Sequence, residues 1–77
     1  MEINIELVLK NDKLKKFDIK DKLSLIINKD CFDNVEEVYD YIIDHIYEQY
    51  GITLHFGEDF DIDEYSQEIL NQIYEFV

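Results

Sequence analysis

Three aspartates at alternating positions, Asp59, Asp61 and Asp63, come closest in this sequence to a known ligand pattern. They match the first three ligand positions of an EF-hand calcium loop. The sixth position of that loop is a glycine that permits a sharp turn, and here it is Glu64. The twelfth is a glutamate that closes the cage with two oxygens, and here it is Leu70. We therefore expect neither a specific calcium site nor any other bound metal.

Residues that could support catalysis are sparse and scattered. Cys31, His45 and His55 form neither a C-x-x-C motif nor an i,i+4 histidine pair, so their spacing does not suit zinc. No local signature marks a cysteine–histidine nucleophile, and among so many carboxylates no acid–base pair is singled out. Only Gly51 and Gly57 are present, too few for a phosphate-binding loop. The sequence predicts a protein that is not an enzyme and uses no cofactor.

Charge is divided unevenly along the chain, whose formal net charge is −12. All seven lysines lie within residues 10–29, and arginine is absent. Residues 30–77 contain fourteen acidic side chains and no lysine or arginine, whereas the surfaces of most small domains mix both signs. Direct binding to nucleic acid is disfavoured, because neutralising phosphates requires clustered basic residues.

Four of the five acids in residues 34–50 follow helical spacing and fall in one row opposite the apolar positions. The row and its flanking tyrosines are Glu37, Asp40, Asp44 and Glu48, with Tyr41 and Tyr47. Like charges four residues apart cost a helix about 0.2–0.5 kcal/mol per pair. They are about 6 Å apart, within the Debye length of about 8 Å at physiological salt, so their potentials add. Such a row predicts attraction to a basic protein, with tyrosines as anchors.

A second set of acids follows Gly57. It comprises Glu58, Asp59, Asp61, Asp63, Glu64 and Glu68. One DNA strand presents a phosphate about every 3.4 Å along the axis, more densely than a single helical row of carboxylates. A mimic of nucleic acid would therefore need two rows. We expect both sets to contribute to one partner-binding surface.

Apolar periodicity predicts the elements that position these residues. Residues 3–9 alternate as a half-buried strand, and residues 11–13 suggest a turn that lacks the usual glycine. The expected hairpin register places Leu7 opposite Phe17 and Ile5 opposite Ile19. Residues 22–28 fit a third strand or a short helix equally well.

The remaining chain predicts two helices and a short strand. A helix over 34–50 begins at Asp33 or Asn34 and ends at Gly51. Its apolar face contains Val35, Val38, Tyr39, Ile42, Ile43, Ile46 and Tyr50. A strand over 52–56 and a helix over about 61–76 follow, the latter with Ile62, Tyr65, Ile69, Ile73 and Phe76 as its buried stripe. The predicted fold is one α+β domain over 1–77, with a small antiparallel sheet packed against two amphipathic helices.

Composition also bears on the compartment. No apolar run is long enough to cross a bilayer, the first residues do not resemble a secretion signal, and a single cysteine fits a reducing environment. The abundance of Ile, Lys, Asn and acids, without Ala or Arg, is typical of an AT-rich bacterium or its phage. We expect a protein of the bacterial cytoplasm.

Three functions follow as hypotheses. The first is an inhibitor that mimics nucleic acid and blocks a basic nucleic-acid-binding enzyme, of the phage anti-CRISPR or anti-restriction type. The second is an immunity protein or antitoxin that neutralises a basic toxin. The third is a non-catalytic subunit of a larger assembly or a homo-oligomer such as a homodimer, in which an exposed apolar patch and not the acidic row makes the contact. Apart from these three, the acidic face could serve only solubility.

Overall fold

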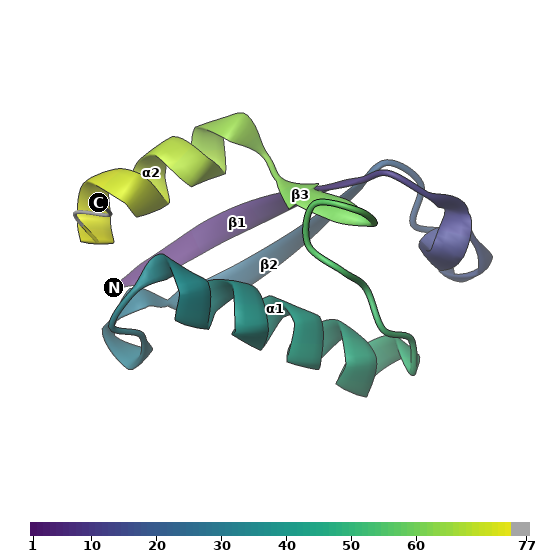
Figure 1. The fold of residues 1–77 in the computed structure, drawn as a ribbon, viewed down its shortest axis with the longest axis horizontal. Helices are drawn as coiled ribbons and strands as arrows, with labels where there is room; N and C mark the ends of the chain where they lie inside the picture. The colour runs from purple at the N-terminus through teal and green to yellow at the C-terminus, as the bar shows by residue number, and fades with distance from the viewer. Residues whose placement is uncertain (75–77) are drawn as a thin grey trace.

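Strand β1, Glu2–Leu9, is the central strand of a three-stranded antiparallel sheet with the order β2-β1-β3. The computed structural model describes residues 1–74 (Figure 1). The other elements are a 3-10 helix over Asp12–Phe17, β2 over Lys22–Asn28, a 3-10 turn over Lys29–Cys31, α1 over Val35–Tyr50, β3 over Phe60–Ile62 and α2 over Glu64–Tyr74. The predicted α+β class, with a small antiparallel sheet and two helices, is confirmed.

The partner of β1 in the hairpin differs from the predicted one. Leu7 pairs with Leu23 and Ile5 with Leu25, so residues 22–28 are a strand and the predicted pairing with Phe17 and Ile19 is wrong. The connection is a 3-10 helix instead of a tight turn, because the Asn11 side chain accepts a hydrogen bond from the backbone N–H of Lys13 at 3.0 Å. Its apolar Leu14 is buried, which holds the connection against the core.

The sheet has one buried and one exposed face. Ile3, Ile5 and Leu7 of β1 point into the core with Ile27 of β2. The alternate positions Asn4, Ser24 and Ile26 are exposed. Helix α1 covers the buried face with Val35, Val38, Ile42 and Ile46, none of which is accessible to solvent. Its predicted bounds are confirmed: Asn34 accepts from the N–H of Glu37 at 3.0 Å, and Gly51 ends the helix with φ of 70°.

The third strand lies later in the chain than predicted. Residues 52–55 are irregular and Phe56 makes only an isolated bridge, whereas Phe60–Ile62 pairs antiparallel with Leu7–Leu9. Gly57, with φ of 86°, turns the chain so that Phe60 and Ile62 enter the core. The predicted strand over 52–56 is therefore wrong: Leu54 is buried, but residues 52–55 form no backbone pairing with another strand.

Helix α2 begins later than predicted and presents a different face to the core. Asp63 begins it by accepting from the N–H of Tyr65 at 3.1 Å. Its buried residues are Ser66 and Leu70, while Tyr65 is 71% exposed, so the predicted stripe through Tyr65 is wrong. Ile69 and Ile73 pack partly buried, Ile62 belongs to β3, and Phe76 lies outside the described residues. Because β3 uses residues 60–62, the helix starts only at Glu64, and the face that packs on the core is the one that contains Ser66, Ile69, Leu70 and Ile73.

Two neighbouring isoleucines of β2 provide a test of this register. Ile27 is 2% exposed and Ile26 is 67% exposed. We expect Ile27→Thr to lower the free energy of unfolding by about 2–4 kcal/mol, because it leaves a void and buries a hydroxyl. The matched change Ile26→Thr should stay within about 0.5 kcal/mol of the unmodified protein. Urea denaturation measures both, and equal losses would contradict the assigned faces.

Candidate protein-binding surface

The acidic row on α1 is exposed to solvent. Glu37, Asp40, Asp44 and Glu48 are all exposed, on the side of the helix opposite its buried residues. Their spacing follows the helical repeat, so the carboxylates form one line along the helix axis. We refer to this row, together with Tyr41 and Tyr47, as the α1 acidic face.

None of the acids on α1 has a basic partner among residues 1–74. The lysine ion pairs of this region are Lys10–Asp61 at 2.7 Å, Lys13–Asp59 at 3.2 Å, Lys15–Asp12 at 2.9 Å, Lys22–Asp63 at 3.5 Å and Lys22–Glu6 at 3.6 Å. Every one of these contacts lies outside α1. The negative potential of the α1 acidic face is therefore not neutralised locally by the lysines.

The row divides into one acid with a structural role and three without. The carboxylate of Glu37 accepts from the backbone N–H of Asp33 at 2.9 Å, and its place in the first turn suits the positive end of the helix dipole. Asp40, Asp44 and Glu48 lie further along, and Glu48 lies in the last turn, where a negative charge is unfavourable. The stability of α1 thus does not account for these three charges.

The two tyrosines of the α1 acidic face are exposed to different degrees. Tyr41 is 40% exposed, and its ring packs near Phe32 at 5.3 Å and His45 at 5.8 Å between centroids. Tyr47 is 58% exposed. Tyr41 is thus held in place by neighbouring rings, and both present amphipathic surface beside the carboxylates.

Asp59 is buried, whereas the prediction placed it with the other acids of the second set on one exposed surface. The residue is only 8% exposed. Its carboxylate accepts from the backbone N–H of His55 at 2.8 Å, from the Lys13 ammonium at 3.2 Å and from the Asn11 side chain. Burial acts to raise the pKa of Asp59, but these three donors hold it below its ordinary value. Asp59 joins the 55–59 turn to the 3-10 helix.

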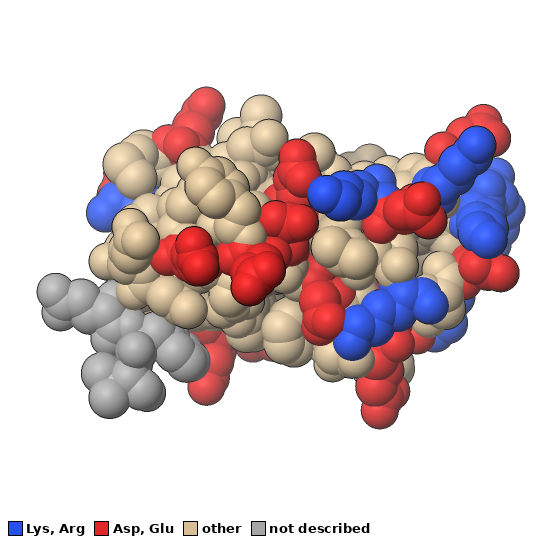
Figure 2. All heavy atoms as spheres, turned by 90° about the horizontal axis from the view of Figure 1, so that it is seen from above, with Lys and Arg blue, Asp and Glu red and all other residues tan. Residues whose placement is uncertain are grey.

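The rest of the second set is also divided. Asp61 and Asp63 are partly buried and ion-paired with Lys10 and Lys22. Only Glu58, Glu64 and Glu68 are exposed. Seen from the side of α2, the lysines gather with interleaved acids at the end that carries the β1–β2 connection (Figure 2). The pairing of β1 with β3 creates this arrangement, since it brings residues around Lys10 beside residues 59–61.

These contacts leave no continuous second row beside the first. In the view of Figure 1, α1 and α2 appear below and above the strands, and the two helices meet where the Tyr39 hydroxyl of α1 is hydrogen-bonded to the Gln67 side chain of α2. The α1 row points away from the core that both helices cover. The candidate surface is therefore the α1 acidic face alone.

Other kinds of site find little support in the part of the chain that the structure describes. No three His, Cys, Asp or Glu side chains within residues 1–74 are grouped so that they could hold a metal ion. No helix in this region is both long and apolar enough to cross a membrane. Cys31 is exposed.

One hollow was not predicted. A groove of about 540 Å³ lies between β1 and the first turns of α2, lined by residues such as Asn4, Tyr65 and Ser66. Ser66 is buried beside this groove and accepts a hydrogen bond from the backbone N–H of Glu6, a contact that no local pattern in the sequence indicates.

Removing the Asp59 carboxylate tests its role as an anchor. We expect Asp59→Ala to lower the free energy of unfolding by about 2–3 kcal/mol, because partly buried donors of His55, Asn11 and Lys13 lose their acceptor. The neighbouring exposed Glu58→Ala should change it by no more than about 0.5 kcal/mol. Thermal or urea unfolding at pH 7 distinguishes these outcomes, and a neutral Asp59→Ala would contradict the anchor.

The same carboxylate makes stability depend on pH. Because the folded pKa of Asp59 is lowered, its contribution is complete above the ordinary pKa of about 3.9 and is lost as the pH falls through the folded value. The stability advantage of the unmodified protein over Asp59→Asn should therefore shrink as the pH falls below about 4. Urea titrations of both proteins between pH 7 and pH 3 measure this, and a constant difference would contradict it.

The repulsion within the α1 row can be measured directly. Asp44 has a like-charged neighbour four residues away on each side, so Asp44→Asn should raise the free energy of unfolding by about 0.4–1 kcal/mol at low salt. Asn and Asp have similar helix propensities, which isolates the charge. The gain should diminish in high salt. The control is Glu58→Gln, outside the row, for which we expect almost no change in the free energy of unfolding. If Asp44→Asn does not raise it either, the carboxylates of the row do not repel one another measurably.

Comparisons with protein-family models, with curated proteins and with solved structures found no match for this chain. The function of the α1 acidic face must accordingly be inferred from its own charge, exposure and contacts.

Proposed function

We propose that this chain is a protein-binding inhibitor whose α1 acidic face docks on the basic surface of a nucleic-acid-binding enzyme. The observation that supports this most directly is that the acids of this face are exposed and lack a nearby lysine. Asp40, Asp44 and Glu48 are exposed, and none forms an ion pair with a lysine within residues 1–74. A surface that only needed hydration could alternate acids with lysines and avoid the repulsion.

The physical consequence of this row is a long-range attraction for positive charge. Neighbouring carboxylates are about 6 Å apart, closer than the Debye length of about 8 Å, so they act together on an approaching partner. Fields of this kind raise association rates by about 10–10³-fold. Tyr41 and Tyr47 add contact area that costs little conformational entropy when buried, as is typical of interface anchors.

Basic enzymes that bind nucleic acid are the natural class of partner, because their clefts are built to bind rows of negative charge. One row of carboxylates reproduces only part of the charge density of a DNA strand, whose phosphates rise about 3.4 Å each. The proposed mimicry is therefore partial: the face occupies a section of the cleft instead of its whole length. Within this class we propose the phage anti-CRISPR or anti-restriction type of inhibitor.

Charge reversal on two surfaces provides the test. The tagged protein captures its partner from a bacterial lysate at low salt, and the affinity of the purified pair is then measured by isothermal titration calorimetry. We expect Asp40→Lys, Asp44→Lys and Glu48→Lys together to weaken binding by about 100-fold or more, since like charges then face each other. The matched control Glu58→Lys, Glu64→Lys and Glu68→Lys changes the net charge equally and should weaken binding by no more than about threefold.

Competition identifies the mode of action. A double-stranded DNA or RNA oligonucleotide should displace the unmodified protein from its partner, and the affinity should fall steeply as salt is raised. Equal losses in both triple variants would show that net charge, and not the α1 acidic face, drives binding. A partner that stays bound while its nucleic-acid site remains open would contradict mimicry and favour the neutralisation of a basic toxin.

A further inference from the structure

The backbone of β1 directs alternate residues to opposite edges. Toward β2, the N–H of Leu9 donates to Asp21 O at 2.8 Å, and Met1 O accepts from the N–H of Lys29 at 3.0 Å. Toward β3, the N–H of Lys10 donates to Asp59 O at 2.8 Å, and Glu6 O accepts from the N–H of Asp63 at 2.7 Å. Odd-numbered residues of β1 therefore bond to β2, and even-numbered residues face the side of β3.

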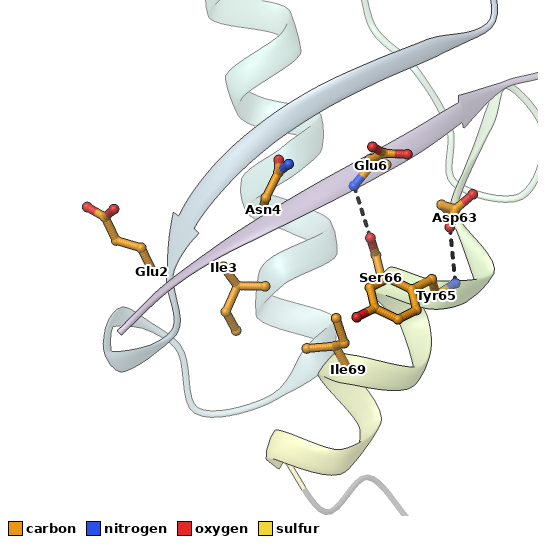
Figure 3. A pocket seen from close by; sticks show the side chains of 8 residues that line it. All are labelled: Glu2, Ile3, Asn4, Glu6, Asp63, Tyr65, Ser66 and Ile69. Carbon is orange, nitrogen blue, oxygen red and sulfur yellow. Dashed lines mark hydrogen bonds between the residues drawn. The ribbon is translucent and has the colours of Figure 1, made fainter.

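The edge of β1 on the β3 side extends well beyond β3. Strand β3 has only three residues and pairs with Leu7–Leu9, whereas β1 begins at Glu2. The chain then leaves the sheet into α2, where Ser66 Oγ accepts from the N–H of Glu6 at 3.1 Å (Figure 3). The hydroxyl of Ser66 thus accepts the hydrogen bond that a backbone carbonyl would accept if β3 continued as a strand. Beyond it, the N–H and C=O groups of Asn4 and Glu2 face the groove.

No described segment occupies this edge. The hydrogen bonds within residues 1–74 include none to the groove-facing N–H or C=O of Asn4. The groove beside it measures about 540 Å³ and is lined by Ile3 from the sheet and by Tyr65 and Ile69 from α2. Figure 3 shows these side chains around the gap between β1 and α2. The ring of Tyr65, which is 71% exposed and not part of the core, offers apolar surface along one side of the groove.

The charge around the groove is negative. Its lining includes the carboxylates of Glu2, Glu6 and Asp63. Lys22 is the only lysine of the described residues in ion-pair distance of any of them, at 3.6 Å from Glu6 and 3.5 Å from Asp63. Three acids against one shared cation leave the site complementary to a basic ligand.

We propose that this edge binds an extended, lysine- or arginine-containing segment of a partner protein, which adds to the sheet as a strand beside β1. Backbone groups of the segment bond to Asn4 and Glu2. Its alternate side chains lie against Tyr65 and Ile69, and its cations lie beside the carboxylates of Glu2 and Glu6. The site is separate from the α1 acidic face and does not depend on the function proposed for it.

A second copy of this chain is a poor occupant of the same edge. Antiparallel pairing of two such edges about Asn4 would place Glu2 of each copy opposite Glu6 of the other. Like charges directly opposite each other destabilise a strand pair, and charged edges are a common protection against such association. The acids thus select against self-pairing and in favour of a basic segment.

Synthetic peptides provide the probe. A fluorescent heptapeptide of alternating lysine and valine is titrated with the full chain and followed by fluorescence anisotropy and by amide NMR shifts. We expect shifts at Glu2–Glu6 and Tyr65. The same peptide N-methylated at every residue should bind at least about tenfold more weakly, because the backbone donors on both of its edges are blocked. A glutamate–valine peptide should not bind.

Matched variants assign the binding to the edge. Asn4→Pro removes the groove-facing N–H and leaves the bonds to β2 intact, so it should weaken binding about tenfold, whereas Asn4→Ala should stay within about twofold. If Asn4→Pro does not fold, the N-methylated peptide decides alone. The Asp40→Lys, Asp44→Lys, Glu48→Lys variant should bind this peptide within about twofold of the unmodified protein, which separates this proposal from the preceding one.

Three results would overturn the proposal. One is equal affinity for the plain and N-methylated peptides, which would mean attraction by charge alone. Another is a set of amide shifts confined to α1. The third is a concentration-dependent shift of Glu2–Glu6 without any peptide, which would show that a second copy occupies the edge.

Discussion

The short pairing of β3 with the end of β1 determines where charge and open backbone occur in this molecule. Only Leu7–Leu9 of β1 are covered by β3. At that end the sheet is completed, and the lysines of the β1–β2 connection meet the aspartates of residues 59–63. At the other end, no strand within residues 1–74 lies beside β1 on that side, and a groove lies between β1 and α2. The shortness of β3 thus explains two features: the ion-paired aspartates at one end of β1 and the unpaired backbone edge at the other.

The pairing of β1 with β3 also explains why positive and negative charges that are separate in the sequence lie together in the fold. The lysine-rich first third and the acid-rich remainder are separate in sequence, but antiparallel pairing places Lys10 beside Asp61 and lets Lys13 reach Asp59. Helix α1 packs on the sheet through its apolar side and presents its acids outward, beyond the reach of these lysines. A small domain has a narrow margin of stability, so repulsion retained on α1 is a cost that folding alone does not explain.

The elements that could be predicted from sequence were those determined by local interactions. The apolar face and the caps of α1 follow from residues within a few positions of one another, and the α+β class follows from the order of elements. The hairpin register could not be predicted, because Asn11 and Asp18 replace a glycine turn with a 3-10 helix, which carries the chain past Phe17 before β2 begins. The position of β3 was missed because three residues, two of them apolar, give almost no periodic signal.

The candidate site was predicted in part for similar reasons. The α1 acidic face belongs to one helix, and its exposure could be predicted because helical spacing places these acids opposite the apolar residues. The second set depended on which acids meet lysines in the fold. Nothing in the D-x-D-x-D spacing reveals that Asp59 turns inward to accept from His55, Asn11 and Lys13. Ser66 has the same character: its role is defined by the backbone N–H of Glu6, sixty residues away.

The two proposed surfaces bind by different physics, which allows them to cooperate without depending on each other. The α1 acidic face acts at a distance and tolerates imprecise geometry, so it favours encounter more than it fixes orientation. The β1 edge acts only at hydrogen-bond distance, where strand pairing imposes direction and register. For a basic partner with an extended segment, the α1 acidic face would speed association, and strand pairing at the β1 edge would fix the orientation of the complex. Because the second event would then be intramolecular, even a weak strand addition would extend the lifetime of the complex.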